Sequence, residues 1–473
     1  MTDNSRNVRQ ENSFHIKKFL KLDNLRLGLF EKFLLLAPIF VWFSYQPLIR
    51  LAQSTTMNFE LSFSLIYLTV LAIFALPIIV KSKQTLLRSR AVWLVGTLFF
   101  WQFLTLFWTV NLVRGILTFG VFALIFISFC AIIAQIETVK KILPALTKIL
   151  IISAVVMGIL AIIQMFVGIY LSRNETLLCA GCVAAQFGFA RPNVFTIEPQ
   201  FFGSLLLVPT LILMHFILTK KSKISHDLAF AFLVMVLILT LSRGAIFAFG
   251  TGVIILAIIN FRKIRAIALG VALMMISFVA ALTLQGSVAV LNPNFHEKFF
   301  TTIAKSINQL SMGLVDFRDK TISGTIPPTI AEPQFDGYVA ESTDVRLGLT
   351  KLAFETWAQD PARIIFGVGL GGAGVAMADF SNDNSAREIV QNEYVEILLE
   401  RGLIGALIFV AVIIGFFIIT QQQKWAWAIA AAFMVQWIFF SGLPNALHIY
   451  LVLIILFANS ISPRAQSKPA KRS

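Results

Sequence analysis

The sequence has few charged residues, few cysteines and no group of metal-ligating side chains. Charged residues make up 13% of its 473 residues, about half the share of an ordinary soluble domain, so a simple soluble enzyme is excluded. Three cysteines exclude a disulfide-rich scaffold. Cys179 and Cys182, in C-A-G-C, allow a tight disulfide. No further histidine or cysteine lies near them to complete a four-ligand zinc site, and we expect no metal and no cofactor.

The sequence is rich in long apolar runs. Apolar residues form 58% of the chain, and the mean hydropathy is +0.82. Because about 20 helical residues cross the hydrocarbon core of a bilayer, these runs predict an all-α polytopic membrane protein with about 12 transmembrane helices. We place the spans at residues 33–49, 58–80, 91–109, 112–134, 145–171, 199–218, 228–242, 244–260, 266–285, 403–420, 425–443 and 446–460.

Basic residues are unevenly shared between the loops that connect these spans. The net charge is +15, and its basic residues cluster in alternate loops, as cytoplasmic loops do. This pattern predicts that both termini are cytoplasmic and that the long loop between helices 9 and 10 is periplasmic. The charge therefore indicates membrane topology, with the lipid bilayer as a partner and no nucleic acid.

The topology divides the chain into five parts. The N-terminal part is polar and basic and lacks the pattern of a cleavable signal peptide. The expected parts are a cytoplasmic tail (1–28), transmembrane helices 1–9 (29–285), a periplasmic loop domain (286–402), transmembrane helices 10–12 (403–460) and a second cytoplasmic tail (461–473).

Arg243 is the first candidate for a functional residue. Basic residues flank 228–260 on both sides, so an even number of crossings lies between them, and we expect two short helices joined at 241–244. Arg243 then lies near the outer membrane plane. Charged residues at membrane depth are costly and usually functional. This arginine either snorkels to lipid headgroups or binds a phosphate with its guanidinium fork.

A second group of candidates lies in the outer loop that ends in R-P-N-V-F-T-I-E-P-Q. Arg191 and Glu198 directly precede the span that opens with Pro199. Because proline favours the first position of a helix, Glu198 is expected at the helix N-terminus. An acid there is either functional or a simple cap.

The periplasmic segment contains a polar helix followed by a glycine-dense loop. After its expected N-cap, Thr343, the helix carries Arg346 in its first turn, where a cation gains nothing from the helix dipole; it is either a ligand-binding residue or a solvated one. The loop at 367–374 contains G-x-G-x-x-G but lacks the strand and βαβ unit of a dinucleotide site. Its glycines, Gly369 and Gly371 among them, are expected to expose N–H groups to a phosphate.

The segment Q-N-E-Y-V-E begins at Gln391. It places Asn392, Glu393 and Tyr394 at the start of a helix that continues into the tenth span. An acid at this position complements the helix dipole. Glu393 is alternatively a general base or a ligand of a sugar hydroxyl. Tyr394 is suited to stacking on a pyranose ring, and Asn392 is a further candidate for substrate binding.

Several of these motifs, in this order, resemble the O-antigen ligase and polymerase superfamily. The motifs are F-W-T-V-N-L-V-R-G from Phe107, T-L-S-R-G-A-I-F from Thr240, R-L-G-L from Arg346, D-P-A-R-I-I-F-G-V-G-L-G from Asp360 and Q-N-E-Y-V-E-I-L-L-E-R-G-L-I-G from Gln391. The expected spans, with the long outer loop between the ninth and tenth, are similar as well.

The resemblance implies a glycosyltransferase with a GT-C-like fold in the bacterial inner membrane, acting in surface polysaccharide assembly. Its donor is a glycan on polyprenyl pyrophosphate, and its acceptor is a hydroxyl of a glycan, lipid or protein. It uses no metal. By motif position, Arg191, Arg243 and Arg346 bind the pyrophosphate.

One position departs from the family pattern. Members typically have a histidine where this chain has Gln391, and a glutamine side chain does not accept a proton at neutral pH. Either Glu393 or Glu198 is then the base, or the site acts by positioning and electrostatics alone. The departure favours a polymerase-like or divergent member. The competing interpretations are a transporter or flippase of lipid-linked glycans and a non-catalytic assembly protein.

Overall fold

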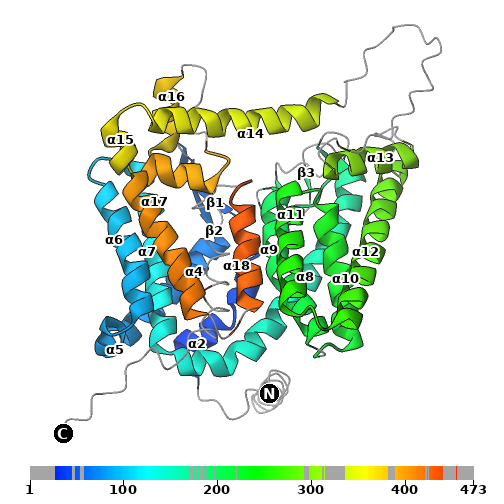
Figure 1. Ribbon diagram of the computed structural model, residues 1–473, viewed down its shortest axis with the longest axis horizontal. Helices are drawn as coiled ribbons and strands as arrows, with labels where there is room; N and C mark the ends of the chain where they lie inside the picture. The colour runs from blue at the N-terminus through cyan, green and yellow to red at the C-terminus, as the bar shows by residue number, and fades with distance from the viewer. Residues whose placement is uncertain are drawn as a thin grey trace, which may run out of the picture.

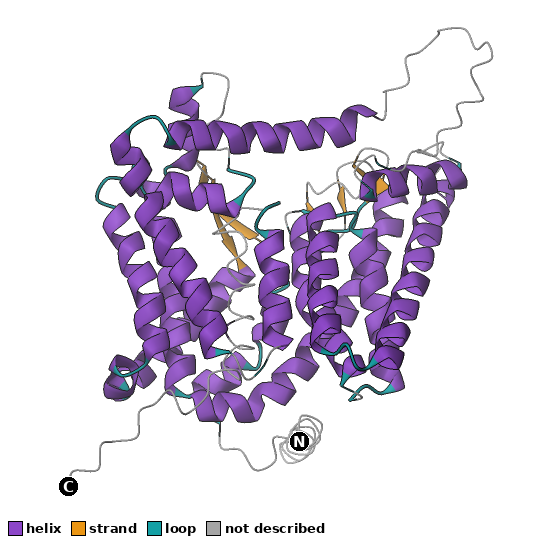
Figure 2. Cartoon of the chain, viewed as in Figure 1, coloured by secondary structure: helices purple, strands orange, loops and turns teal. Residues whose placement is uncertain are grey.

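The computed structural model describes residues 27–44, 48–53, 58–170, 175–176, 179–180, 185–186, 189–196, 198–219, 221–291, 298–311, 314, 336–381, 389–420, 423, 425–439 and 454. Helices dominate this part of the chain (Figure 2). They are α2 (Leu29–Leu34), α3 (Ala37–Phe40), α4 (Phe63–Lys81), α5 (Lys83–Leu87), α6 (Arg90–Thr105), α7 (Leu112–Ala134), α8 (Ile136–Tyr170), α9 (Pro199–Leu218), α10 (Ile224–Leu239), α11 (Arg243–Ile259), α12 (Ile264–Leu291), α13 (Phe299–Leu310), α14 (Asp336–Trp357), α15 (Pro361–Phe366), α16 (Ala373–Phe380), α17 (Glu393–Ile419) and α18 (Trp425–Gln436).

Three antiparallel strand pairs accompany the helices, which the expectation of an all-α chain did not include. Strands β1 (Leu48–Gln53) and β2 (Asn58–Ser62) form one pair. Strands β3 (Glu175–Thr176) and β4 (Cys179–Ala180) form the second, and β5 (Ala185–Gln186) and β6 (Phe189–Ala190) form the third.

Six helices in the described part are long and apolar enough to cross a membrane: α4, α7, residues 136–166 of α8, α9, α12 and α17. The apolar helices α10, α11 and α18 are shorter. This confirms a polytopic helical membrane protein. The count of about 12 spans, the GT-C-like fold and the periplasmic placement stay predictions, and the span expected at 446–460 lies outside the described residues except for residue 454.

Several helix ends follow directly from the sequence. α7 and α9 begin and end where the apolar runs predicted, at 112–134 and 199–218. The side chain of Asn111 caps α7 by accepting from the N–H of Arg114, which satisfies one of the unpaired donors of the first turn. The predicted pair of short helices within 228–260 is confirmed, because α10 ends at Leu239 and α11 begins at Arg243.

Two predicted elements are wrong. The span expected at 33–49 is broken into α2, α3 and the start of β1. Pro38, which has no N–H to donate to a carbonyl of the preceding turn, opens α3. Thr343 is not an N-cap: it lies inside α14, which begins at Asp336. Ala340 and Glu341, which favour helix, extend that helix upstream, so Arg346 is not in its first turn.

The helices form two groups with α18 between them (Figure 1). One group contains α4, α5, α6, α7 and α17, and the other contains α8 to α13. α14 lies across one end of both groups, beside α15 and α16 (Figure 1). We call this end of the molecule the α14 face. The larger hydrophobic core extends from α2, α4 and α7 through α8 and α9 to α10, α11 and α18, and nearly all of α9 is buried.

Candidate active site

The turn between α10 and α11 presents Arg243 at the α14 face. Arg243 is the first residue of α11 and is half-buried. The preceding Leu241 has a φ of 49° and is buried. A β-carbon makes this left-handed conformation unfavourable, and such strained residues cluster at functional sites. The hydroxyl of Thr240 accepts from the N–H of Ser242 at 3.2 Å and stabilises the turn.

Arg191 lies against the same turn. Its Nε donates to the carbonyl of Thr240 at 3.0 Å, three residues before Arg243. The side chain is half-buried. This contact therefore places Arg191 at the turn that carries Arg243, and these are two of the three arginines predicted to bind pyrophosphate.

A buried polar network holds the loop that carries Arg191. The side-chain carbonyl of Gln164 accepts from the N–H groups of Asn193 and Val194, at 3.0 and 2.9 Å. The Gln164 amide donates to Asn193 Oδ1 at 2.7 Å, and Asn193 donates to the carbonyl of Thr196 at 2.8 Å. Sequence reasoning missed this role. The available signal was a lone glutamine inside an apolar span.

The backbone at the end of α18 is the second meeting point of the site. The carbonyl of Phe439 accepts from Gln200 Nε2 at 3.1 Å and from Arg346 Nη1 at 3.4 Å. The Phe439 ring stacks on Phe247 of α11, with centroids 6.0 Å apart. A β-carbon added at Gly244 would lie 2.7 Å from the β-carbon of Phe439. The turn that follows α18 therefore packs directly on Gly244, the residue after Arg243.

The Q-N-E-Y segment is anchored to the same turn of α18. Asn392 is the N-cap of α17, as its Oδ1 accepts from the N–H of Tyr394 at 3.0 Å. Its amide donates to the carbonyl of Ile438 at 3.2 Å, and the N–H of Glu393 donates to the carbonyl of Trp437 at 2.9 Å. Gln391 precedes this cap and is half-buried.

The candidate base and its neighbour differ in environment. The Glu393 side chain is buried, with 2% exposed. The Tyr394 hydroxyl donates to the carbonyl of Met434 at 2.8 Å, and its ring meets Phe409 and Trp437 edge-on. Tyr394 thus packs between α17 and α18. Its predicted role in stacking on a sugar stays a prediction, as does the substrate role of Asn392.

Glu198 is at the N-terminus of α9, as expected, and its side chain makes no capping hydrogen bond there. It is exposed and lies two residues before Gln200, whose amide reaches Phe439. Glu198 therefore faces solvent near the site, whereas Glu393 is enclosed by it.

The glycine-dense loop packs against backbone from two helices. The N–H of Gly369 donates to the carbonyl of Glu400 at 3.0 Å, and the Thr109 hydroxyl donates to the carbonyl of Leu370 at 2.8 Å. Gly369 and Gly371 have φ of 87° and 76°, and β-carbons there would meet backbone atoms at 2.3 and 2.6 Å. Close backbone approach explains these glycines. Phosphate contact by Gly369 or Gly371 stays a prediction.

The first part of α17 carries buried charge that sequence reasoning did not assign. Glu396, Glu400 and Arg401 are all buried, and the backbone is kinked at Gly402, with a φ of 65°. Trp101 donates to the carbonyl of Arg401 at 3.0 Å. The run E-I-L-L-E-R was visible in the sequence as an acidic and basic patch at the start of an apolar span.

Two other predictions concern metals and cysteines. No group of three or more His, Cys, Asp or Glu suited to a metal occurs among the described residues. Cys182 and the side chain of Cys179 lie outside the described part, so their disulfide stays a prediction. Cys130 is a buried free cysteine in α7.

The comparison with known families identifies the segment that contains most of these residues. Residues 228–410 match the family model described as O-Antigen ligase. Over these residues the chain is similar to the O-antigen ligase family. The superfamily predicted from the motifs is thereby confirmed. The matched segment spans α10 to α17 and includes Arg243, Arg346 and Glu393, whereas Arg191 and Glu198 precede it. No curated protein matches the chain.

Proposed function

We propose that this protein is a metal-independent glycosyltransferase that transfers a glycan from a polyprenyl-pyrophosphate donor to an acceptor hydroxyl during surface polysaccharide assembly. The observation that carries the proposal is the convergence of three arginines and the backbone of the buried residue Glu393 on two backbone turns. Arg191 and Arg243 meet at the α10–α11 turn, and Arg346 and Glu393 meet at the end of α18. Phe439 and Gly244 join the two turns.

The arginines suit a pyrophosphate leaving group. Each guanidinium has five N–H donors in a planar fork, and this geometry matches the oxygens of a phosphate. Gly244 and Ala245 follow in the first turn of α11, where N–H groups have no acceptor within the helix. Arginine donors and helix N–H groups together are a favourable environment for phosphate.

The reaction forms a bond from the acceptor oxygen to the anomeric carbon of the donor glycan. The bond from that carbon to the pyrophosphate oxygen breaks, and polyprenyl pyrophosphate leaves with the electron pair. Its charge is stabilised by the arginines, which act as prearranged donors. The acceptor hydroxyl gives its proton to a base. We assign this role to the Glu393 carboxylate, because Gln391 does not accept a proton and Glu198 faces solvent.

The membrane placement follows the same proposal. The α14 face lies on the periplasmic side of the bacterial inner membrane, both termini are cytoplasmic, and the chain has about 12 spans in a GT-C-like arrangement. Lipid-linked donors then present their pyrophosphate at the membrane surface where the arginines lie.

Arg243→Ala tests the pyrophosphate assignment. We expect loss of at least about a hundred-fold in transfer, since removing a prearranged charge donor costs that much in comparable sites, with normal membrane insertion. The measurement is complementation of a gene deletion, with surface glycan resolved on a gel. Arg262→Ala is the matched control, because Arg262 follows the opposite end of the same helix.

The gel also separates the reaction types. Loss of long chains with retained single repeats indicates a polymerase, and full-length chains held on the lipid carrier indicate a ligase. Unchanged glycan in the deletion strain, or normal glycan with Arg243→Ala, contradicts the proposal.

A further inference from the structure

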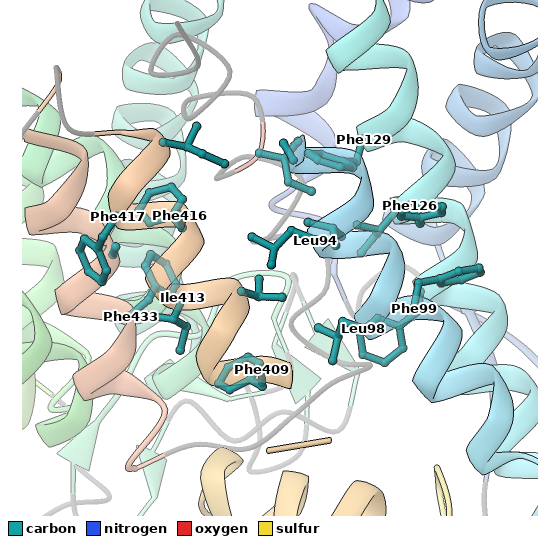
Figure 3. Close-up of a pocket in the computed structure, with 18 of the residues that line it drawn as sticks. Leu94, Leu98, Phe99, Phe126, Phe129, Phe409, Ile413, Phe416, Phe417 and Phe433 are labelled. Atoms are coloured by element: carbon teal, nitrogen blue, oxygen red, sulfur yellow. The ribbon is translucent and has the colours of Figure 1, made fainter. Parts of the chain in front are cut away.

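An aromatic-rich cavity lies on the side of α18 away from Arg243 and Arg191. Its volume is about 310 Å³. Side chains from α6 and α7 line one side, and side chains from α17 and α18 line the other (Figure 3). Phenylalanine predominates in the lining, with Phe99, Phe126, Phe129, Phe409, Phe416 and Phe433.

The cavity runs lengthwise between the helices. Its lining on α17 extends from Arg401 to Thr420, and on α6 from Gln102 to Ala91. At 1.5 Å per residue these stretches correspond to about 28 Å and about 16 Å, a large part of the thickness of a hydrocarbon core. The Arg401 end is the end beside the α14 face. A long, narrow, apolar space of this kind fits an extended hydrocarbon chain.

Arg401 gives the cavity a charge at one end. Only 2% of this residue is exposed, and its guanidinium lies over the Phe122 ring, 5.5 Å from the centroid. Its Nε has no hydrogen-bond partner, and no described carboxylate forms an ion pair with it. A buried charge without a partner is strongly unfavourable. The position therefore calls for an anionic group, which a phosphate at the end of a lipid chain supplies.

The end of α18 separates this cavity from the arginines of the candidate active site. Trp437 lines the cavity, while Phe439, two residues later, binds Arg346 and packs on Gly244. The backbone of Glu393 is bonded to Trp437. The backbone of Glu393 is therefore attached to the segment that lies between the two cationic sites.

We propose that this cavity binds the acceptor, carried on a single polyprenyl chain whose phosphate contacts Arg401. The inference rests on the proposed function, in which the donor pyrophosphate occupies Arg191, Arg243 and Arg346. A separate cation for a separate phosphate indicates a second lipid-linked substrate. The cavity volume of about 310 Å³ suits part of one hydrocarbon chain. The proposal makes the protein a polymerase, in which donor and acceptor are both polyprenyl-linked.

The test counts undecaprenyl phosphate molecules bound to the purified full-length protein by native mass spectrometry. We expect two molecules on the unaltered protein. Leu98→Trp fills the cavity from α6, and we expect this variant to bind only one molecule. Ile413→Trp fills the cavity from α17 and should give the same count, so that the result does not depend on the folding of one variant. Arg243→Ala also leaves one. Ile414→Trp is the matched control and should still bind two molecules, because Ile414 is 54% exposed and does not line the cavity.

Arg401→Gln and a competing lipid test the phosphate and the chain. We expect Arg401→Gln to weaken one of the two binding events about ten-fold or more, the scale of a charge-assisted hydrogen bond. Dioleoyl phosphatidylglycerol in equal amount does not displace either molecule. Displacement from the cavity by this two-chain lipid overturns the assignment to a polyprenyl chain.

The remaining outcomes separate this inference from the proposed function. A single bound molecule that both Leu98→Trp and Arg243→Ala remove means that the donor chain occupies the cavity, which overturns the second site. Two molecules on both cavity variants overturn the cavity as a binding site. If Arg243→Ala still binds two molecules while each cavity variant binds one, the cavity is supported as a binding site, and the assignment of the donor pyrophosphate to Arg243 is contradicted.

Discussion

Arg346 donates a hydrogen bond to the carbonyl of Phe439 across 93 residues of sequence, at 3.4 Å. A cation is favoured at a helix C-terminus, where carbonyl groups lack partners, and Phe439 lies just beyond the last turn of α18. The bond attaches α14, a helix of the polar segment, to a turn that also contacts α9, α11 and α17. A change at this turn is therefore expected to affect every part of the candidate site.

Gly244→Ala tests the importance of this turn. The added β-carbon would lie 2.7 Å from the β-carbon of Phe439, so Phe439 must move, and the carbonyl that holds Arg346 and Gln200 moves with it. We expect thermal stability to fall by about 1–3 kcal/mol, as for overpacked cores, and glycan transfer to fall about ten-fold or more, because small displacements at a positioned site have large effects.

Gly250→Ala in the same helix is the matched control, because a β-carbon there meets nothing within 4 Å. Alanine favours helix over glycine by about 1 kcal/mol, so this variant should be at least as stable and fully active. Equal activity of both variants would show that the position of Phe439 does not matter for transfer.

Glu393→Gln removes the assigned base while keeping the size of the side chain. We expect transfer to fall about 10²–10⁴-fold, the contribution of general-base catalysis, with unchanged donor binding. Glu198→Gln should retain activity, since Glu198 is exposed and makes no capping bond. The assay is in vitro elongation with a lipid-linked oligosaccharide. An active Glu393→Gln together with an inactive Glu198→Gln would assign the base to Glu198. If both variants are active, neither residue is the base, and the site acts by positioning and electrostatics.

The glycine-dense loop is predicted to matter for folding. A β-carbon at Gly369 would lie 2.3 Å from Cα of Thr109, and backbone on both sides leaves no room to relax. We expect Gly369→Ala to lose more than about 2 kcal/mol of stability, measured as thermal unfolding in detergent. Gly348→Ala in α14, where nothing lies within 4 Å, is the control and should be neutral or stabilising. A stable but inactive Gly369→Ala protein would instead support the predicted phosphate contact.

Sequence periodicity and caps predicted the elements that depend on local interactions. α7 and α9 match their predicted ranges, and the turn before Arg243 was located from basic residues on both flanks of one apolar stretch. The start of α14 was wrong because Thr343 has the residue type of a cap without the conformation of one. Apolar length also failed at 33–49, where Pro38 opens a new short helix.

The arrangement of the site depended on contacts that leave no mark in a sequence. Arginines, Gln200 and Asn392 bind backbone carbonyls of Thr240, Ile438 and Phe439, and every residue type has such a carbonyl. The cavity arises from the combined shapes of four helices. Sequence motifs therefore identified the candidate residues, while their mutual positions required the three-dimensional structure.

Gln164 offers the clearest case of a distant residue that should control the site. It accepts two backbone N–H bonds and donates one side-chain bond within a buried loop. In Gln164→Ala the N–H groups of Asn193 and Val194 lose their acceptor, at about 1–3 kcal/mol for each unsatisfied group. Because the same loop carries Arg191, we expect donor binding to weaken together with stability. Binding of undecaprenyl phosphate and thermal unfolding measure the two effects.

Gln164→Glu separates these contributions, because a carboxylate keeps the acceptor for both N–H groups and loses only the donor to Asn193 Oδ1. It should recover part of the stability and place two oxygens opposite each other, so that Asn193 must turn. Ser153→Ala is the comparison variant in the same helix: Ser153 is also buried and hydrogen-bonded, but to Pro38 and Trp42 far from Arg191. Equal loss of donor binding in Ser153→Ala and Gln164→Ala would mean that general instability, and not the position of Arg191, is responsible.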